Sequence, residues 1–332
     1  MRKLYFLVPG TTGKFGGGGL WAELNTCKLV QQVCEAKVVT YRQRESETAF
    51  LADILPNCDR QSAIFVIGWG FDVPKIMRQL KEQNVVYHAH SSNYGFSLPA
   101  SVPIITVSRN TMGYWGEKAA SSLIYYLPNQ ISDEFNNRHQ PRDIEILVQT
   151  RKSSDYLLQQ LIPALQTNHR VEIIDRYVED LAGLFNRSQI YLYDSAEYWA
   201  SSGVTEGFGL PPLEALACGC HVFSSVNHGL ADYLDPSFNC HKIACYSLEY
   251  DLMRIKQVLQ LSNSQSNTWL EEYRGEHLTT RLEVILTAIN QFFDCQATLK
   301  ANIPKLTKKR IRQLKIEQFA RKLRRKLNPK QT

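Results

Sequence analysis

The sequence lacks any long hydrophobic run. No stretch of about 18 uncharged apolar residues occurs in the 332-residue chain, so we expect no membrane-spanning helix. Residues 1–9 contain an apolar run that is too short for the core of a signal peptide, and no small-residue cleavage site accompanies it. We interpret this run as a first buried strand.

Dense, regularly spaced cysteines are also missing. The eight cysteines are scattered, unlike those of a secreted disulfide scaffold, so we expect reduced thiols in a cytoplasmic protein. Residues 218–221 and 240–245 combine cysteine with histidine, but their spacings differ from those of structural zinc sites. The first group also falls in a predicted helix. We therefore expect no metal site.

Acidic residues are almost absent from the end of the chain. Residues 301–332 hold twelve lysines and arginines and a single acid, which gives a net charge of +11. Since the whole chain carries +6, residues 1–300 carry −5. Residues 304–330 are predicted to form a basic amphipathic helix. The apolar residues expected on one face of it are Ile311, Leu314, Phe319, Leu323 and Leu327.

This basic helix fits an anionic membrane surface, which attracts lysine and arginine while apolar side chains enter the lipid. The protein would then be peripheral to the inner face of the membrane. A helix that is merely solvated is an alternative. Nucleic-acid binding is a third, disfavoured because no recognition motif or set of stacking aromatic residues accompanies the charge.

The rest of the chain alternates predicted strands and helices, which is typical of parallel sheets with helices on both faces. The strands predicted in the first half cover residues 3–8, 36–41, 62–67, 85–88 and 104–107, and those in the second half cover 144–149, 171–174, 189–193 and 220–224. The fold class is therefore α/β, with two Rossmann-like domains. The predicted limits are 1–128 for the N-terminal domain, 129–143 for a linker, 144–298 for the C-terminal domain and 299–332 for the basic tail.

One stretch, residues 206–219, carries the strongest functional signal. Proline is tolerated in the first turn of a helix, so the double proline at 211–212 predicts a loop over 207–210 and a helix to about Cys218. Gly219 is predicted to end that helix. A helix N-terminus beside glycines is a phosphate site, because free N–H groups point at the anion.

Two carboxylates, Glu206 and Glu214, flank this predicted phosphate site. The whole stretch resembles the E-x7-E signature of retaining, nucleotide-sugar-dependent glycosyltransferases of the two-domain GT-B type, family 4 in particular. The resemblance implies two domains facing across a cleft, with Glu206 contacting the donor sugar and Glu214 binding the ribose hydroxyls. It also implies that backbone amides of Gly207, Phe208, Gly209 and Leu210 hold the phosphates and the sugar.

Two further segments resemble the same family with substitutions. Residues 127–131 are similar to its interdomain Pro-Asn-Gly-Ile segment, with Gln130 in place of glycine. Residues 226–232 are similar to its Gly-Gly-x-x-Glu element, with His228 replacing a glycine and Asp232 replacing the glutamate.

The resemblance covers most of residues 127–235 and, more loosely, 1–126. Four consecutive glycines at 16–19 precede a predicted helix and would let a phosphate approach the backbone. In the family a glycine pair here closes over the donor phosphates, and the resemblance points to Gly16 and Gly17.

Other phosphate-binding motifs fit the glycine run less well. The spacing of a Walker A motif is absent. Residues 17–22 satisfy a relaxed dinucleotide fingerprint, G-x-G-x-x-A, and Arg42 and Arg44 would suit the 2′-phosphate of NADP. However, the fingerprint lies eight residues beyond its strand, so NADP binding stays a minor alternative.

Two pairs of residues complete the candidate site. His88 and His90 end a predicted strand, and the family's similar His-x-His segment implies that His90 points toward the donor sugar. A strand-end histidine can equally be structural. Arg151 and Lys152 follow another strand. The resemblance implies that Arg151 neutralises the leaving diphosphate, with Lys152 replacing the family's lysine that usually lies five or six residues later.

We therefore expect a metal-independent, retaining glycosyltransferase of hexosyltransferase type, with His90, Glu206 and Arg151 at the reacting centre and no cofactor. It would move a sugar from a nucleoside-diphosphate donor to a glycan or lipid-linked acceptor hydroxyl. The alternative is a non-catalytic or epimerase-like nucleotide-sugar-binding protein of the same fold. The nucleotide base, the sugar and the acceptor do not follow from the sequence.

Overall fold

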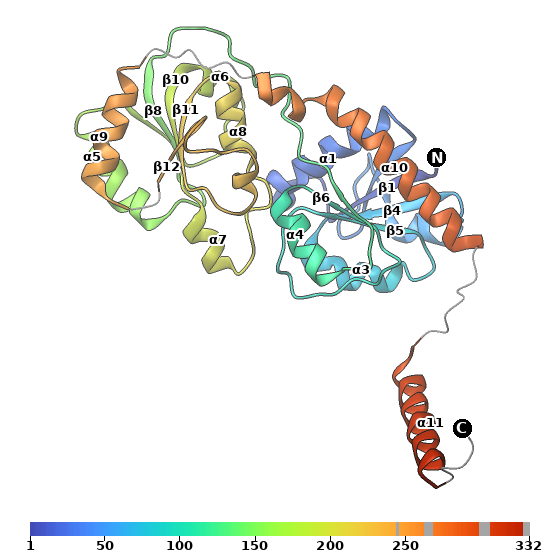
Figure 1. The fold of residues 1–332 in the computed structure, drawn as a ribbon. Helices are drawn as coiled ribbons and strands as arrows, with labels where there is room; N and C mark the ends of the chain where they lie inside the picture. The colour runs from blue at the N-terminus through green and yellow to red at the C-terminus, as the bar shows by residue number, and fades with distance from the viewer. Residues whose placement is uncertain (244–245, 262–267, 299–305, 328–332) are drawn as a thin grey trace. The chain divides into compact units, whose positions relative to one another are not determined.

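The computed structural model describes residues 1–243, 246–261, 268–298 and 306–327. The chain forms two compact units, Met1–Asn290 and Gln291–Thr332. The first unit contains two parallel sheets with helices on both faces (Figure 1). The predicted fold class, α/β with two Rossmann-like sheets and a basic C-terminal helix, is thereby confirmed.

The first sheet has seven parallel strands in the order β3-β2-β1-β4-β5-β6-β7. Strand order reverses between β1 and β4, which is where ligands bind in open α/β sheets. The strands are β1 (Lys3–Val8), β2 (Ala36–Thr40), β3 (Ala49–Phe50), β4 (Ala63–Ile67), β5 (Val85–Ala89), β6 (Ile104–Thr106) and β7 (Ile124–Tyr126). The helices are α1 (Gly18–Gln31), α2 (Leu51–Ile54), α3 (Val73–Gln79) and α4 (Arg109–Lys118), with short 3-10 turns at Gly13–Phe15, Leu55–Asn57 and Gly70–Asp72.

Both faces of the first sheet are buried, so its strands are continuous apolar runs rather than alternating ones. One face packs against α3 and α4, where Ile76 and Trp115 contact Tyr87 and its neighbours. The other face lies against α1 and α10 (Gly275–Thr298), whose Leu282 and Leu286 line a small apolar cavity with residues of β1 and β4.

The second sheet has five parallel strands in the order β12-β11-β10-β8-β9, and its order reverses between β8 and β10. The strands are β8 (Ile144–Gln149), β9 (Val171–Ile174), β10 (Ser188–Tyr193), β11 (His221–Ser224) and β12 (Cys240–Lys242). The helices are a π-helical segment (Leu157–Leu161) that continues as α5 (Ile162–Gln166), then α6 (Leu181–Arg187), α7 (Ala196–Ser202), α8 (Leu210–Ala217) and α9 (Leu248–Leu259), with 3-10 turns at His228–Asp232 and Thr268–Tyr273.

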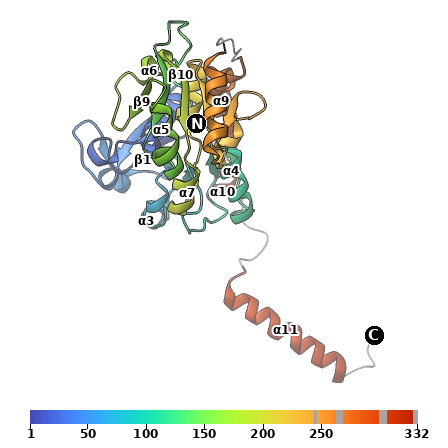
Figure 2. The same ribbon diagram turned by 90° about the vertical axis from the view of Figure 1, so that its left-hand side faces the viewer.

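Helices cover both faces of this second sheet as well. Figure 2 shows α5 and α9 in front of the strands, where Leu165 and Ile255 pack on Ile190 and its neighbours. On the opposite face α6 and α8 supply Phe185 and Leu213 to a separate core cluster. The chain thus buries ordinary apolar cores on both faces of each sheet, as its hydrophobic content predicts.

Helix α10 departs from the predicted domain limits. Its residues up to Asn290 belong to the first compact unit, and its apolar side chains line a cavity with the first sheet. The predicted limits place residues 275–290 in the 144–298 domain, because hydrophobic periodicity predicts a helix without showing which sheet it covers. The polar segment 129–143 also contributes buried side chains, Ile131 and Phe135, to the core of the second sheet.

The second unit, Gln291–Thr332, contains the end of α10 and all of α11 (Lys308–Leu327). On α11 the exposed side chains of Ile316, Phe319 and Leu323 follow the i, i+3, i+7 spacing of one helix face. Ile311 and Leu314 lie about 140° and 160° around the helix from Ile316, since each residue turns it by about 100°. The prediction that they share this face is therefore wrong, and the side chain of Leu327 lies outside the described ones.

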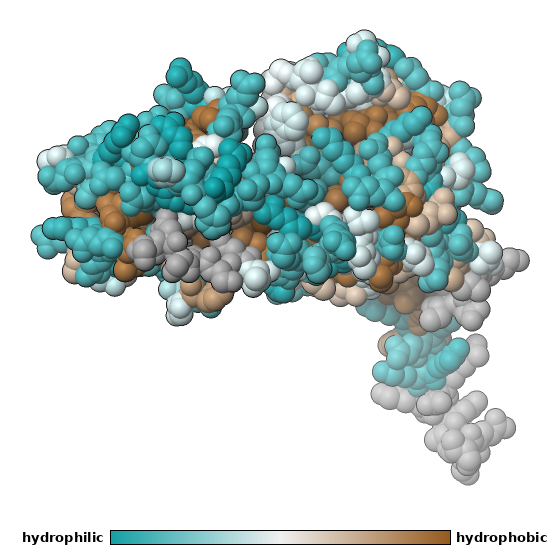
Figure 3. All heavy atoms as spheres, turned by 90° about the horizontal axis from the view of Figure 1, so that it is seen from above, coloured by the Kyte–Doolittle hydropathy of each residue, from teal (hydrophilic) through white to brown (hydrophobic). Residues whose placement is uncertain are grey.

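No helix among the described residues is both long enough and apolar enough to cross a membrane. On the face shown in Figure 3, hydrophilic side chains predominate and hydrophobic ones form smaller patches between them. Apolar atoms make up much of the surface of any folded protein, so this pattern by itself indicates no function.

The end of α8 follows the prediction made from Gly219. Gly219 has a φ of +84°, its N–H donates to the carbonyl of Leu216, and the N–H of Cys220 donates to that of Ala215. This pair of bonds is a Schellman motif, which satisfies carbonyls at the helix end and favours glycine at the left-handed position. It turns the chain directly from α8 into β11.

Gly219→Ala is expected to lower the free energy of unfolding by about 1 to 3 kcal/mol, because an alanine is strained at this φ. An added Cβ would also lie 2.6 Å from Asn137 Nδ2 and 2.7 Å from Arg142 Nη2. Urea unfolding followed by circular dichroism measures the change. Gly116→Ala on α4 is the matched control, since a Cβ there meets nothing within 4 Å. Equal stability of the two variants would contradict the conclusion that the backbone at position 219 requires glycine.

Candidate functional site

A pocket of about 270 Å³ lies at the carboxyl ends of the strands of both sheets. Its walls come from the starts of α1 and α8 and from the loops after β5, β8 and β10. The loops after β8 and β10 flank the place where strand order reverses in the second sheet, and α1 follows β1, one of the two strands at the reversal in the first sheet. The residues of the predicted site that line it are His90, Arg151, Lys152, Glu206, Gly207, Phe208, Gly209 and Leu210.

The start of α1 presents unpaired backbone donors to this pocket. Gly17 is the N-cap residue and no side chain caps the helix, so the N–H groups of the first turn have no intrahelical partner. Gly18 and Gly19 line the pocket, whereas the predicted pair, Gly16 and Gly17, does not. Sequence could not separate four equal glycines, because the helix start decides which amides point outward.

Helix α8 brings a second N-terminus to the pocket. Gly209 has a φ of +78° and leads into Leu210, the first helical residue. Pro211 and Pro212 follow at the next positions and carry no N–H, so the first turn offers fewer donors than usual while keeping its dipole. The helix begins one residue earlier than predicted.

Arg151 and Lys152 add positive charge to the same pocket. Lys152 has a φ of +68°, and its Nζ lies 4.3 Å from the ring centroid of Trp199. Burial lowers the pKa of Lys152, and the negative charge of Glu206 opposes that change. A partly buried ammonium group gains from an incoming anion, because the anion replaces lost hydration.

Glu206 is buried and rigidly held. Its Oε2 accepts hydrogen bonds from the Tyr193 hydroxyl at 2.6 Å, the Trp199 Nε1 at 2.7 Å and the Ser195 hydroxyl at 3.2 Å. Among the described residues none donates to Oε1. The carboxylate is thus oriented by one oxygen, and the other is available to a ligand in the pocket. The aromatic partners were not predicted, since nothing in their spacing relates them to Glu206.

The loop that carries Glu206 packs tightly between two backbones. A Cβ on Gly207 would lie 1.5 Å from the carbonyl oxygen of His90, and one on Gly229 would lie 2.2 Å from the carbonyl oxygen of Gly207. Only glycine fits at both places. The N–H of Gly229 donates to the carbonyl of Glu206 at 3.0 Å, which holds the two loops together.

Hydrogen bonds between loops of the two sheets accompany this packing. The Ser91 hydroxyl donates to the Thr205 carbonyl at 2.6 Å, and the Ser92 N–H donates to the Thr205 hydroxyl at 3.2 Å. Asn93 reaches the carbonyl of Gly203 at 2.6 Å. These small polar residues were missed in sequence because serine and threonine are common in loops without any such role.

His90 lies beside a buried carboxylate that the sequence did not reveal. Glu23 Oε2 lies 2.6 Å from His90 Nε2 and 2.6 Å from His88 Nδ1. Burial opposes ionisation of Glu23, but the charges and hydrogen bonds of the two histidines lower its pKa to about 2. Glu23 comes from the middle of α1, so only the packing of α1 on β5 brings it to the histidines.

This geometry determines the tautomer of His90. Burial, together with the nearby His88, lowers the pKa of His90, which favours the neutral ring. Because the neighbouring carboxylate is ionised, Nε2 must carry the proton and donate it to Glu23. Nδ1 then is the ring nitrogen with a free lone pair.

Glu23, His88 and His90 are also the one group of metal-ligand side chains that comes together among the described residues. Their contacting atoms are 2.6 Å apart. Ligands around an ion with bonds of about 2.0 to 2.2 Å lie about 3 Å or more from one another. The separations match hydrogen bonds rather than coordination.

Glu214 does not line the pocket. It lies on α8, one turn beyond the pocket wall, with a half-buried side chain. Burial, with the charge of Glu134, raises its pKa to about 8. A carboxyl group with a raised pKa is frequent at functional sites, although buried structural acids show it too.

The zinc alternative receives no support from the described residues. Cys218, Cys220 and Cys240 are buried, and their sulfurs do not gather with a histidine. The Cys220 thiol donates to the Phe185 carbonyl at 3.1 Å. Cys245 lies outside the described residues.

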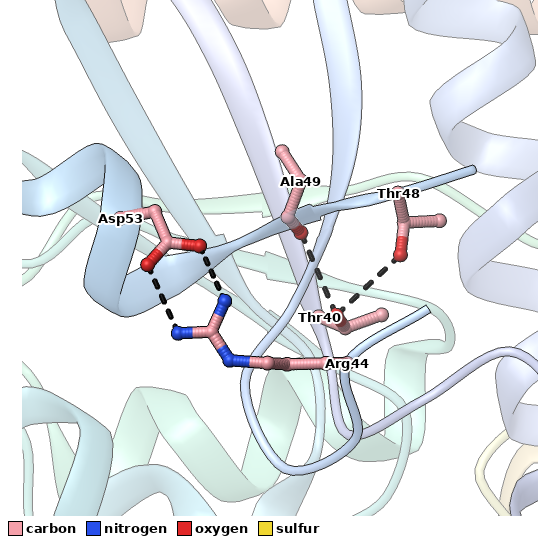
Figure 4. Close-up of polar contacts among 5 residues, drawn as sticks. All are labelled: Thr40, Arg44, Thr48, Ala49 and Asp53. Carbon is pink, nitrogen blue, oxygen red and sulfur yellow. Dashed lines mark hydrogen bonds and ion pairs between the residues drawn. The ribbon is translucent and has the colours of Figure 1, made fainter. Parts of the chain in front are cut away.

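The arginines proposed for NADP are engaged elsewhere. Arg44 forms a two-pronged pair with Asp53, at 2.6 Å and 2.9 Å, beside the contacts of Thr40 with Thr48 and Ala49 (Figure 4). Arg42 is paired with Asp72. Each guanidinium already has a carboxylate, so neither supports binding of a 2′-phosphate.

The departures from the family pattern have structural consequences. His228 replaces a glycine and has a φ of +50°, so it adopts the left-handed conformation for which glycine is preferred. Asp232 accepts a hydrogen bond from the N–H of Arg109 at 2.7 Å, at the start of α4. Gln130 lies 3.1 Å from the position of a Cβ on Gly275, near the start of α10.

Residues 141–268 match a family model described as "Glycosyl transferases group 1". This range includes Arg151, Lys152 and the whole 206–219 stretch, whereas His90 and the glycine run precede it. The sequence matches no protein in a comparison with curated proteins.

Solved structures of GT-B glycosyltransferases share the fold of the chain. A glycosyltransferase from Rickettsia africae is 13% identical, with 88% of this chain and 98% of that chain covered and a TM-score of 0.56. Sucrose-phosphate synthase from Thermosynechococcus elongatus is 13% identical, with 90% and 98% covered and a TM-score of 0.56. HepE from Anabaena, in complex with UDP-glucose, is 12% identical, with 90% and 100% covered and a TM-score of 0.54. At these identities the likeness shows a GT-B fold.

The raised pKa of Glu214 predicts a pH-dependent stability. The folded protein keeps a proton to about pH 8, whereas the unfolded chain loses it near pH 4.5. The contribution of this proton is complete below pH 4.5 and is lost as the pH rises through 8. Glu214→Gln should therefore be more stable than wild type at pH 8 by about 1 to 2 kcal/mol, discounted for partial exposure, and equal to it at pH 4.5.

Urea unfolding at several pH values measures this difference, with Glu283→Gln on the exposed side of α10 as the matched control. A stability gap between Glu214→Gln and wild type that does not change with pH would contradict the raised pKa.

Proposed function

We propose that the protein is a glycosyltransferase that moves a sugar from a nucleoside-diphosphate donor to an acceptor hydroxyl. The observation that carries this proposal is the composition of one pocket. Two helix N-termini, Arg151 and Lys152 surround it, and a fixed carboxylate, Glu206, lies in the same wall. The helix N-termini and the two basic side chains suit a diphosphate, and the carboxylate suits sugar hydroxyls. The match of residues 141–268 to group 1 glycosyl transferases supports the same activity.

The positive groups would hold and stabilise the leaving diphosphate. The free backbone amides of Gly18 and Gly19 and the start of α8 favour a bound anion. Arg151 and Lys152 neutralise the negative charge that develops on the diphosphate as its bond to the sugar breaks. The structurally similar HepE from Anabaena was solved in complex with UDP-glucose, which supports a nucleotide-sugar as the ligand class. We propose that Glu214 binds the ribose hydroxyls, with the nucleoside part of the donor extending beyond the pocket wall along α8.

The sugar would lie between Glu206 and His90, which line the same pocket. Glu206 accepts a hydrogen bond from a sugar hydroxyl through Oε1, since its Oε2 already accepts from Tyr193 and Trp199. His90 offers the lone pair of Nδ1, since its Nε2 is bonded to Glu23. Both groups are fixed before the sugar binds, so little ordering is left for the reaction itself.

We propose transfer with retention of configuration, on the resemblance of residues 206–219 to retaining enzymes. A bond from the anomeric carbon to the acceptor oxygen forms as the bond to the diphosphate oxygen breaks. The acceptor proton passes to the leaving diphosphate, and Arg151 and Lys152 balance the charge. No metal or cofactor is part of this proposal. The anomeric proton coupling constant of the product, measured by NMR, distinguishes retention from inversion.

We further propose a cytoplasmic enzyme that is peripheral to an anionic membrane. The free thiols among the described cysteines support a reducing compartment. The exposed apolar face of α11, Ile316, Phe319 and Leu323, lies among many lysines and arginines, which supports binding to an anionic lipid surface. A lipid-linked acceptor would fit such a location.

Nucleotide binding tests the donor site. In a thermal-shift panel of UDP, GDP, ADP, dTDP and NADPH, we expect one nucleoside diphosphate to raise the melting temperature of the wild type. Arg151→Gln should weaken its binding at least tenfold, because a charge-assisted contact to phosphate is lost. Glu214→Ala should also weaken nucleotide binding, because the proposed contact with the ribose hydroxyls is lost.

Arg176→Gln is the matched control for the loss of one positive charge outside the pocket. A shift with NADPH alone would replace the proposal with a dinucleotide enzyme. Binding of a nucleotide-sugar without transfer or hydrolysis would favour a non-catalytic or epimerase-like protein, which an isomerised sugar in the reaction would then identify.

Vesicle co-sedimentation tests the proposed membrane surface. The wild type should bind vesicles that contain an anionic phospholipid and should not bind pure phosphatidylcholine. Replacing Ile316, Phe319 and Leu323 together by serine should weaken this binding at least tenfold, because each removed side chain takes apolar area from the lipid. Serine at Ile311 and Leu314, which lie off that face, is the matched control. Unchanged binding in the three-residue variant would reduce the role of α11 to charge alone, and equal loss in both variants would contradict a single apolar face.

A further inference from the structure

A second pocket, of about 160 Å³, adjoins the donor pocket and has no assigned role. It lies in the first sheet's half of the unit, over the carboxyl ends of β1 and β4. The two pockets share Gly19, His90 and Tyr94 in their walls. A ligand in the second pocket would therefore lie directly beside His90.

The walls of this second pocket are almost entirely apolar. Aromatic rings form one side, where Tyr94 and Phe71 meet edge to face with centroids 4.8 Å apart. A Cβ on Gly70 would lie 2.3 Å from the Tyr94 ring, so glycine lets this ring close the wall. The other apolar side chains in the wall are Leu7, Val8, Leu20 and Trp69.

The polar end of the pocket is formed by Glu23 and His90. Glu23 is 3% exposed, and its Oε1 has no hydrogen-bond partner among the described residues. An ionised, buried oxygen without a donor is costly, and the pocket is the space from which a donor can come. The second pocket thus combines a flat apolar body with a hydrogen-bond acceptor at one end.

Size and polarity together define the ligand class. An apolar cavity of about 150 Å³ in another protein binds benzene, so about 160 Å³ holds one six-membered ring. A hexose is similar in size, but its several hydroxyls would face apolar walls and stay unpaired, which costs about 1 to 3 kcal/mol for each such group. One hydroxyl on an aromatic ring leaves no polar group unpaired.

We propose that the second pocket binds an aryl alcohol as the acceptor, with the ring between Tyr94, Trp69 and Phe71 and the hydroxyl on Glu23. The substrate class rests on the proposed function, because the neighbouring pocket supplies the sugar. Glu23 is a recognition and positioning residue here, since it also holds Nε2 of His90.

Ligand-observed fluorine NMR on the full chain tests this with three probes: 4-fluorophenol, fluorobenzene and a fluorinated glucose. Without any donor present, 4-fluorophenol should bind one site, fluorobenzene should bind at least tenfold more weakly, and the sugar should not bind. Glu23→Gln should weaken 4-fluorophenol about tenfold and leave fluorobenzene unchanged, since only the hydroxyl contact is altered.

Phe71→Ala keeps the test decisive if the Glu23 variant folds poorly, because Phe71 is 72% exposed. It should weaken both aromatic probes at least threefold, whereas Phe238→Ala, at a 65% exposed phenylalanine outside the pocket, should match the wild type. Equal binding of 4-fluorophenol and fluorobenzene, or equal behaviour of the two phenylalanine variants, would overturn the proposal.

The same samples separate this inference from the proposed function. Nucleoside diphosphate binding with no binding of 4-fluorophenol keeps the donor site and removes the aryl acceptor. Binding of 4-fluorophenol with silence from all nucleotides keeps the second pocket as a binding site and removes the glycosyltransferase.

Discussion

The site depends on the close approach of the Glu206 loop to the backbone after β5. At Gly207 the distance from a would-be Cβ to the carbonyl oxygen of His90 is 1.5 Å, so any side chain would separate the loops of the two sheets. The hydrogen bonds of Ser91 and Ser92 to Thr205 hold the same contact. Because His90 follows a strand of the first sheet and Glu206 lies in a loop of the second, their shared pocket depends on this contact.

Two buried carboxylates are held in fixed orientations by internal hydrogen bonds. Glu206 and Glu23 each use one oxygen for several internal donors, and the other oxygen has no partner among the described residues. Such groups are oriented before any ligand arrives, which is how a protein lowers the ordering cost of binding. One of them lies in the pocket proposed for the sugar and the other in the pocket proposed for the acceptor.

The positive groups follow a different principle. Helix N-termini, Arg151 and Lys152 need no partner in the unbound protein, because solvent or a bound anion can satisfy them. Lys152 is held over Trp199 in a strained backbone conformation, which keeps its charge near the pocket despite partial burial. A diphosphate would relieve both its desolvation and the unpaired amides of α1.

Short-range sequence patterns were sufficient to predict much of the fold of this protein. Apolar runs, the double proline and Gly219 predicted most strands of both sheets, the start of α8 to within one residue and its end, because each is governed by neighbouring residues alone. The short strands β3, β7 and β12 were not predicted. The tertiary structure decided the rest. It selected Gly18 and Gly19 over the glycines before them, packed α10 on the first sheet, and placed Glu23 against His90. These outcomes depend on contacts between residues far apart in the chain, and no local pattern encodes such contacts.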